Sequence, residues 1–132
     1  METGRKAWST GKETGGEEFA TYLPHIRRRW LEQQAARRKR QEEAWAVARQ
    51  MATLLRIRFA AQEIIAFGSL VYPGRFDDRS DIDLAVSGIP AGGFFRAWAA
   101  AGAIGPFELD LVDLADCSPT LRDVIAQEGV PL

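Results

Sequence analysis

The stretch AFGSLVYPGRFDDRSDIDLAV, residues 66–86, joins two apolar segments through a Gly-Ser turn and a polar link. Asp81 and Asp83 flank Ile82 where the second apolar segment begins. Residues two positions apart in a strand point to the same side of the sheet. Two ionised carboxylates that close repel each other unless one is protonated or a cation lies between them. This spacing therefore indicates a cation site at the start of a strand.

A later segment, FELDLVDL at residues 107–114, supplies further acidic side chains. Asp110 lies in the middle of this expected strand, where burying a lone charge would be costly. If the two strands are neighbours, Asp110 joins Asp81 and Asp83, whereas Asp113 replaces it only if a bulge changes the strand's parity. Mg²⁺ binds through one or two carboxylates together with substrate phosphates. We expect these three aspartates to hold two Mg²⁺ ions.

Gly68 and Ser69 follow the first apolar segment directly. If a helical turn begins there, its free N–H groups favour a phosphate. Glycine allows the backbone to approach a ligand closely, and the serine hydroxyl can donate one further hydrogen bond. A phosphate cradle opposite an acidic metal site is the arrangement needed to transfer a group from a nucleoside triphosphate.

Outward from this stretch, short β-rich runs alternate with helical runs, which predicts an α/β (α+β) fold with a mixed sheet flanked by helices. The expected strands cover residues 63–67, 81–87 and 107–114, and the expected helices cover residues 92–102 and 118–129. In the last helix Ser118 suits the N-cap, Pro119 the first turn and Gly129 the C-terminal end.

The sequence as a whole divides into three parts. It predicts a flexible tail over residues 1–23, a long helical extension over 24–60, and a domain with the candidate site over 61–132. Residues 27–43 contain seven basic and three acidic residues, a local charge of +4, which leaves the rest of the chain at −5. Residues 32–43 are too polar for a core, so the helix either projects there or breaks in two. The basic run Arg37–Arg40 is interpreted as a solvated helix face, with contact to nucleic acid or a partner as the alternative.

The composition of the 132 residues is that of one ordinary domain with enough apolar residues for a core. The single cysteine, Cys117, has no internal partner, which favours a reducing compartment. There is no apolar run of membrane-spanning length and no secretory h-region. We therefore expect a cytoplasmic protein without a membrane contact.

The order of these motifs resembles the minimal nucleotidyltransferases of the DNA-polymerase-β superfamily. The family pattern is Gly-Ser, a spacer, Ser-Asp-x-Asp-Leu, and a later strand with a third acid. The resemblance implies that Gly68 and Ser69 bind the triphosphate and that Asp81, Asp83 and Asp110 hold Mg²⁺. The spacer is one residue longer than usual, and Leu70 stands where the family often has arginine, so a basic group would come from Arg75 or Arg79.

The resemblance also implies transfer of AMP from ATP to a hydroxyl of a partner protein. Members of this family commonly act as antitoxins of HEPN-domain ribonucleases by modifying a tyrosine of the toxin. The long helix would then dock this partner or form a homodimer. Two alternatives stay open: an antitoxin that acts by binding alone, and an enzyme that modifies a small molecule such as an antibiotic.

Overall fold

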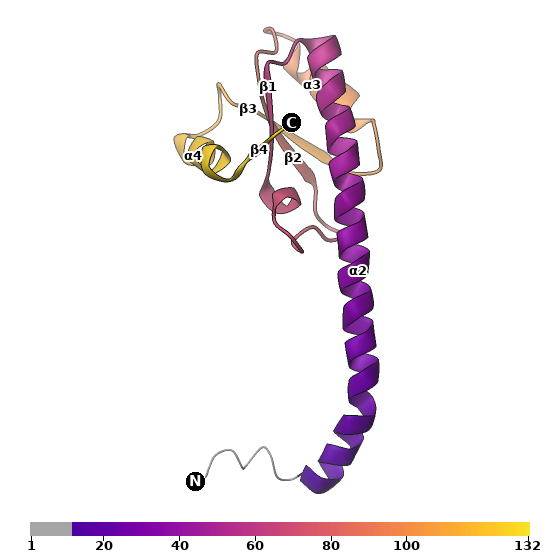
Figure 1. Ribbon diagram of the computed structural model, residues 1–132. Helices are drawn as coiled ribbons and strands as arrows, with labels where there is room; N and C mark the ends of the chain where they lie inside the picture. The colour runs from indigo at the N-terminus through magenta and orange to yellow at the C-terminus, as the bar shows by residue number, and fades with distance from the viewer. Residues whose placement is uncertain (1–11) are drawn as a thin grey trace. The chain divides into compact units, whose positions relative to one another are not determined.

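The computed structural model describes residues 12–132, with side chains from residue 23 onward (Figure 1). The elements follow in the order α2 (Lys12–Phe59), β1 (Glu63–Phe67), the 3-10 turn η1 (Gly68–Val71), β2 (Ile82–Ser87), α3 (Phe94–Gly102), β3 (Leu109–Asp113), α4 (Pro119–Glu128) and β4 (Val130–Pro131). The chain divides into two compact units between Ala36 and Arg37. Within the described part, every helix is too short or too polar to cross a membrane.

The sheet has the strand order β3-β2-β1-β4. Strand β1 pairs antiparallel with β2 and β4, whereas β2 and β3 are parallel. The predicted mixed sheet flanked by helices is therefore confirmed. Strand β4 was not predicted: only two residues long, it lies along β1 at the sheet edge, where a proline such as Pro131 is tolerated.

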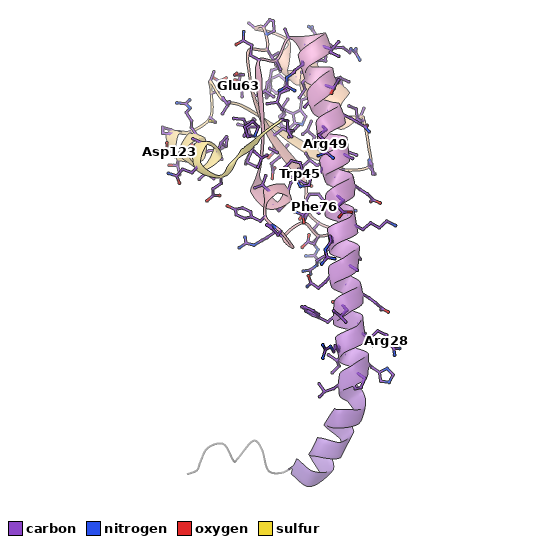
Figure 2. The ribbon with its side chains drawn as sticks, viewed as in Figure 1. Arg28, Trp45, Arg49, Glu63, Phe76 and Asp123 are labelled. Carbon is purple, nitrogen blue, oxygen red and sulfur yellow. The ribbon has the colours of Figure 1, made fainter. Side chains whose placement is uncertain are left out.

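One face of the sheet forms the main core. Alternate residues of the strands are buried there, including Ile64, Leu84 and Leu111. They pack against the C-terminal half of α2 and against α3, whose Ala97 and Ala101 are fully buried. Figure 2 shows Trp45 of α2 and Phe76 of the link before β2 on the interior side of the helix. The period-two pattern of the strands thus buries one apolar face completely.

Helix α2 begins earlier than the sequence predicted. It starts at Lys12 and includes Pro24, which the sequence analysis took as the helix start. A proline inside a helix removes one hydrogen bond and bends the axis, but it does not have to end the helix. The predicted tail therefore differs from the structure over residues 12–23, which are helical, and its residues 1–11 lie outside the described part.

The C-terminal half of α2 belongs to the compact unit that carries the sheet, which begins at Arg37 rather than at the predicted residue 61. The reason is burial: Ala44, Ala48, Met51 and Leu55 are all fully buried against the sheet. The helix also runs without interruption through the polar segment, so it does not break into two helices there.

Helix α4 covers part of the opposite face. Its N-cap is as predicted, because the Ser118 hydroxyl accepts a hydrogen bond from the Leu121 amide at 3.1 Å. Ile125 of this helix packs with Phe67 and Ala85 in a second, smaller core cluster. The remainder of this face, toward the start of β2 and β3, carries the candidate site.

Candidate active site

Three strand ends bring the predicted residues together. Strand β1 ends at Phe67, which pairs with Asp83 of β2, and Asp83 in turn pairs with Asp110 of β3. Because paired residues in neighbouring strands point to the same side, both carboxylates lie on the face that α4 partly covers. Asp81 precedes Asp83 by two positions, just before β2 begins. This register confirms that Asp110 shares a face with Asp83, whereas Asp81 lies outside the paired residues.

The electrostatics of Asp83 reflect this crowding. Burial of its carboxyl group, followed by the neighbouring carboxylates of Asp110 and Asp81 in that order, raises the pKa of Asp83 to about 6. Each of these three causes disfavours the charged form. Asp81 and Asp110 are exposed, so Asp83 is the member of the group that most needs a compensating positive charge.

Gly68 lies directly against Asp83. A Cβ atom added at Gly68 would collide with a carboxylate oxygen of Asp83, and its φ of 76° is unfavourable for other residues. Glycine is thus required here both by the backbone conformation and by the approach of the carboxylate. The motif residues Gly68 and Asp83, 15 positions apart in the chain, form one contact.

The Gly-Ser segment forms a single turn rather than the start of a longer helix. Gly68 and Ser69 begin η1, which comprises four residues, and Ser69 is half-buried beside Gly68. A turn this short offers few free N–H groups, so a phosphate cradle here would depend more on these two residues than the sequence suggested. Of the predicted basic groups, the guanidinium of Arg75 lies over the Tyr72 ring at 5.2 Å.

Two α2 residues that the sequence analysis missed hold the segment after this turn. The side-chain amide of Gln41 donates hydrogen bonds to the carbonyls of Leu70 and Tyr72 at 2.7 and 3.0 Å. Its oxygen accepts one from the Gly74 amide at 3.3 Å. Gln41 therefore fixes three backbone groups of the link that joins the Gly-Ser turn to the two aspartates.

Arg40 holds the next part of the same link. Its Nε donates a hydrogen bond to the Asp77 carbonyl at 3.0 Å, and its guanidinium lies over the Phe107 ring at 4.8 Å. The interpretation of the basic run as a solvated face is therefore wrong for Arg40, although residues 37–39 are exposed. No pattern near Arg40 in the sequence indicates this role, because its partners lie 37 and 67 positions away.

The link also has its own turn. The Asp77 carboxylate accepts hydrogen bonds from the Arg79 amide at 2.9 Å and from the Ser80 hydroxyl at 3.1 Å. These bonds, the one from the Arg79 amide foremost, lower the pKa of Asp77 below its usual value. The Asp77 carboxylate thus stabilises a turn inside the link. This turn accommodates the spacer, which is one residue longer than usual.

The donor types fit a hard divalent cation. The carboxylates of Asp83 and Asp110 on two neighbouring strands and of Asp81 just before β2, one of them with a raised pKa, match the ligand chemistry of Mg²⁺. Across the residues with described side chains, no group of three such side chains is already gathered in a ligating arrangement. The Mg²⁺ site therefore stays a prediction that the geometry permits.

Comparisons with known proteins agree with this fold. A candidate minimal nucleotidyltransferase of known structure matches with a TM-score of 0.58 and 25% identity, over 70% of this chain and 95% of that one. A mutant of the MntA–HepT toxin–antitoxin complex matches with a TM-score of 0.54 and 23% identity, over 64% of this chain and 70% of that one. The resemblance stated from the motifs is thus confirmed for the fold. No family model matches the sequence, and no curated protein does.

Proposed function

We propose that this protein is a nucleotidyltransferase that moves a nucleoside monophosphate, most simply AMP from ATP, to a hydroxyl group of a partner protein. The observation that carries the proposal is the position of Asp83. Its carboxylate lies against the Gly68 backbone, next to Asp110 and Asp81, with its pKa raised by burial and by both neighbours. Catalytic sites commonly show such perturbed groups.

In this proposal the acceptor oxygen attacks the α-phosphorus, a new P–O bond forms, and the bond to pyrophosphate breaks. Asp81 and Asp83 would hold Mg²⁺ together with the triphosphate, and Asp110 would complete the ligand set. Bound Mg²⁺ supplies positive charge for the phosphate oxygens and for the acceptor oxygen. Asp110, whose side chain is exposed, would accept the acceptor's proton.

Gly68 and Ser69 would bind the triphosphate. Because Gly68 has no side chain, its turn lies in contact with the Asp83 carboxylate, so a phosphate bound by the turn would lie close to a cation held by Asp83. Ser69 would add its hydroxyl as a donor. The Gln41 hydrogen bonds would keep the following backbone in place while the site fills.

For the acceptor we propose a HEPN-domain toxin, which would make this chain the antitoxin of a pair. The support is the fold shared with the MntA–HepT complex, whose mutant form carries glutamate in place of two aspartates that are two positions apart. Leu23, Ile26, Trp30 and Leu31 of α2 are exposed apolar residues that would suit docking of this partner or of a second copy of the chain.

The test is to incubate the full chain with Mg²⁺, ATP and the product of the neighbouring gene, which this proposal expects to be a HEPN-domain protein, and to measure the intact masses. We expect the partner to gain one or more AMP groups. The Asp81→Asn/Asp83→Asn variant should abolish the gain, whereas the control Asp123→Asn, on an exposed position of α4, should not change it.

Two results separate the alternatives. Toxin neutralisation that survives the double variant, without any added AMP, would indicate an antitoxin that acts by binding alone. A lack of mass gain on every acceptor, with ATP shown to be bound, would contradict the enzyme proposal.

A further inference from the structure

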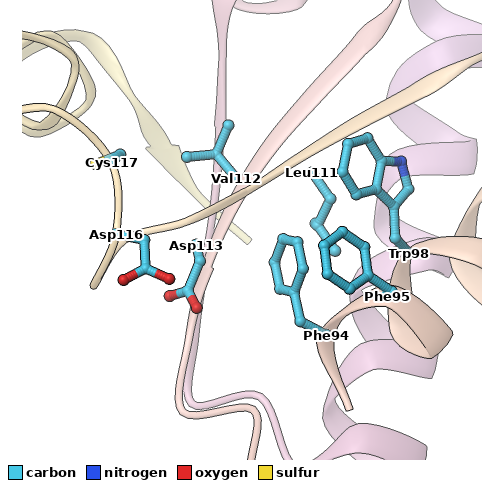
Figure 3. Close-up of a pocket in the computed structure, with 8 residues that line it drawn as sticks. All are labelled: Phe94, Phe95, Trp98, Leu111, Val112, Asp113, Asp116 and Cys117. Atoms are coloured by element: carbon cyan, nitrogen blue, oxygen red, sulfur yellow. The ribbon is translucent and has the colours of Figure 1, made fainter. Parts of the chain in front are cut away.

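A pocket lies between the start of α3 and the end of β3, with a volume of about 370 Å³ (Figure 3). Its lining includes the aromatic residues Phe94, Phe95 and Trp98 of α3, and the acidic residues Asp113 and Asp116. Figure 3 shows the two carboxylates side by side on one flank and the rings on the other. The pocket thus combines an aromatic wall with an acidic wall.

This pocket is separate from the candidate active site. Asp113 lies three positions after Asp110 in β3, and an odd separation places the two side chains on opposite faces of the strand. None of Gly68, Ser69 or the three site aspartates lines the pocket. Binding of a ligand to this pocket can therefore be tested separately from the proposed transfer reaction.

The aromatic wall is ordered by contacts among its rings. Phe94 lies edge-on to Phe95 and Trp98, at centroid distances of 5.4 and 5.9 Å. Phe95 and Trp98 are nearly parallel, with an interplanar angle of 13°. The Trp98 indole N–H donates to the Leu109 carbonyl at 2.7 Å, which fixes this ring to β3. The Phe95 ring is 77% exposed, so a large aromatic surface is available to a ligand.

The acidic wall is held by one tight turn after β3. A carboxylate oxygen of Asp113 accepts a hydrogen bond from the Ala115 amide at 3.0 Å, and the Asp116 amide donates to the Asp113 carbonyl at 3.0 Å. These bonds hold both residues in one turn, and Figure 3 shows their carboxylates on the same flank of the pocket. A positive charge placed between the walls would be attracted by the carboxylates and would also face the aromatic rings.

We propose that this pocket binds a basic side chain, foremost an arginine, of a partner protein. An arginine side chain has an apolar stem and a flat cation, and the guanidinium stacks on aromatic rings while it hydrogen-bonds carboxylates. An anion would be repelled by Asp113 and Asp116, and a purely apolar group would leave both without a counter-charge. The exposed Phe95 ring favours a side chain inserted from outside, because small-molecule sites enclose most of their ligand. Arginine and aromatic residues are also the residues that anchor protein interfaces.

The experiment is an NMR titration of the full ¹⁵N-labelled chain with the peptide acetyl-Gly-Arg-Gly-amide. We expect a saturable shift of the Trp98 indole signal and of the amides of Leu111 and Asp113. The same peptide with citrulline, which has the shape of arginine without its charge, should bind at least about tenfold more weakly. Free arginine amide, which lacks the flanking peptide, should also bind more weakly than the peptide.

Two variants locate the binding. Asp116→Asn should weaken peptide binding about fivefold, in the range of one exposed ion pair. Phe95→Ala should weaken it by a similar factor through the lost ring contact. The controls are Asp123→Asn on α4 and Ile57→Ala on α2, both of exposed residues away from the pocket, and neither should change the affinity.

The proposal would be overturned by an unchanged Trp98 signal at saturating peptide, or by equal binding of the citrulline peptide. Free arginine amide that binds as tightly as the peptide would also overturn it, because the pocket would then be a small-molecule site. These readouts require neither ATP nor a metal, so they are independent of the proposed transferase activity.

Discussion

The two faces of the sheet are built from alternating residues of the same strands, yet they serve different purposes. On one face Leu84 and Leu111 are buried against α2 and α3, and this face is apolar except at the end of β3, where Asp113 stands. On the other face Asp83 and Asp110 stand beside a small cluster under α4. Adjacent residues of one strand therefore have different roles. Those that point to the first face stabilise the core, and those that point to the other face form the candidate site. The comparison predicts that substitutions one position apart will have unlike effects.

The largest effect is expected on the packed face. Leu84→Ala removes a fully buried side chain, and the cavity it leaves should lower the free energy of unfolding by about 2–5 kcal/mol. Asp83→Asn, one position earlier, should leave stability unchanged or slightly higher at pH 7, because it removes a charge that burial disfavours. Urea unfolding of both variants checks this. Equal destabilisation by the two substitutions would contradict the different roles of the two faces, core packing on one and the candidate site on the other.

Gly68→Ala tests how closely the turn and the carboxylate must approach. The substitution places a Cβ in a left-handed conformation and against the Asp83 carboxylate, so it should cost more than about 1–2 kcal/mol of stability. Gly74→Ala is the matched control, because Gly74 has a φ of 78° but no atom within 4 Å of an added Cβ. The difference between the two unfolding free energies measures the collision. No difference would show that Asp83 moves aside freely.

Gln41→Ala should have a smaller effect on stability, about 1 kcal/mol, because it removes side-chain hydrogen bonds to exposed or half-buried backbone. We expect faster hydrogen exchange of the Gly74 amide and of its neighbours, since the link loses its anchor on α2. Gln50→Ala, at an exposed position of the same helix, is the control. Unchanged exchange in the Gln41 variant would exclude this anchoring role.

The smallest effect is expected from the titration of Asp83 in the metal-free protein. Its pKa in the folded state is about 6, above the usual value of about 3.9, so the protonated form favours folding. The associated stability is fully present below about pH 4 and is lost as the pH rises through 6. Because the group is half exposed, we expect less than about 1 kcal/mol. Urea unfolding in EDTA, compared between the natural chain and Asp83→Asn from pH 4 to 7, measures it; parallel curves would contradict the raised pKa.

Much of the fold was predictable because its signals are local. Alternating apolar residues marked the strands, and the Ser118 cap with Pro119 and Gly129 marked α4 within one residue. The candidate site was predictable for a similar reason: Asp81 and Asp83 are two positions apart, and parity alone indicated that they share a side. Asp110 required the further assumption that β2 and β3 are neighbours, which the register confirms.

Other features depended on partners far away in the chain. The contacts of Gln41 and Arg40 with the link are 29 or more positions apart, and their local surroundings read only as a polar, basic helix. Strand β4 is too short to show a period, and it exists because β1 offers a free edge. The early start of α2 was missed because proline is a frequent but not obligatory helix boundary.

Local patterns in the chain were sufficient to predict strands β1 to β3, helices α3 and α4 and the Gly-Ser turn, since each depends on spacing over a few residues. The meeting of Gly68 with Asp83, the anchoring of the link by α2 and the pocket between α3 and β3 followed only from the folded chain. Each of these joins segments whose distance in space is set by packing of the whole sheet, and no spacing along the sequence encodes that distance.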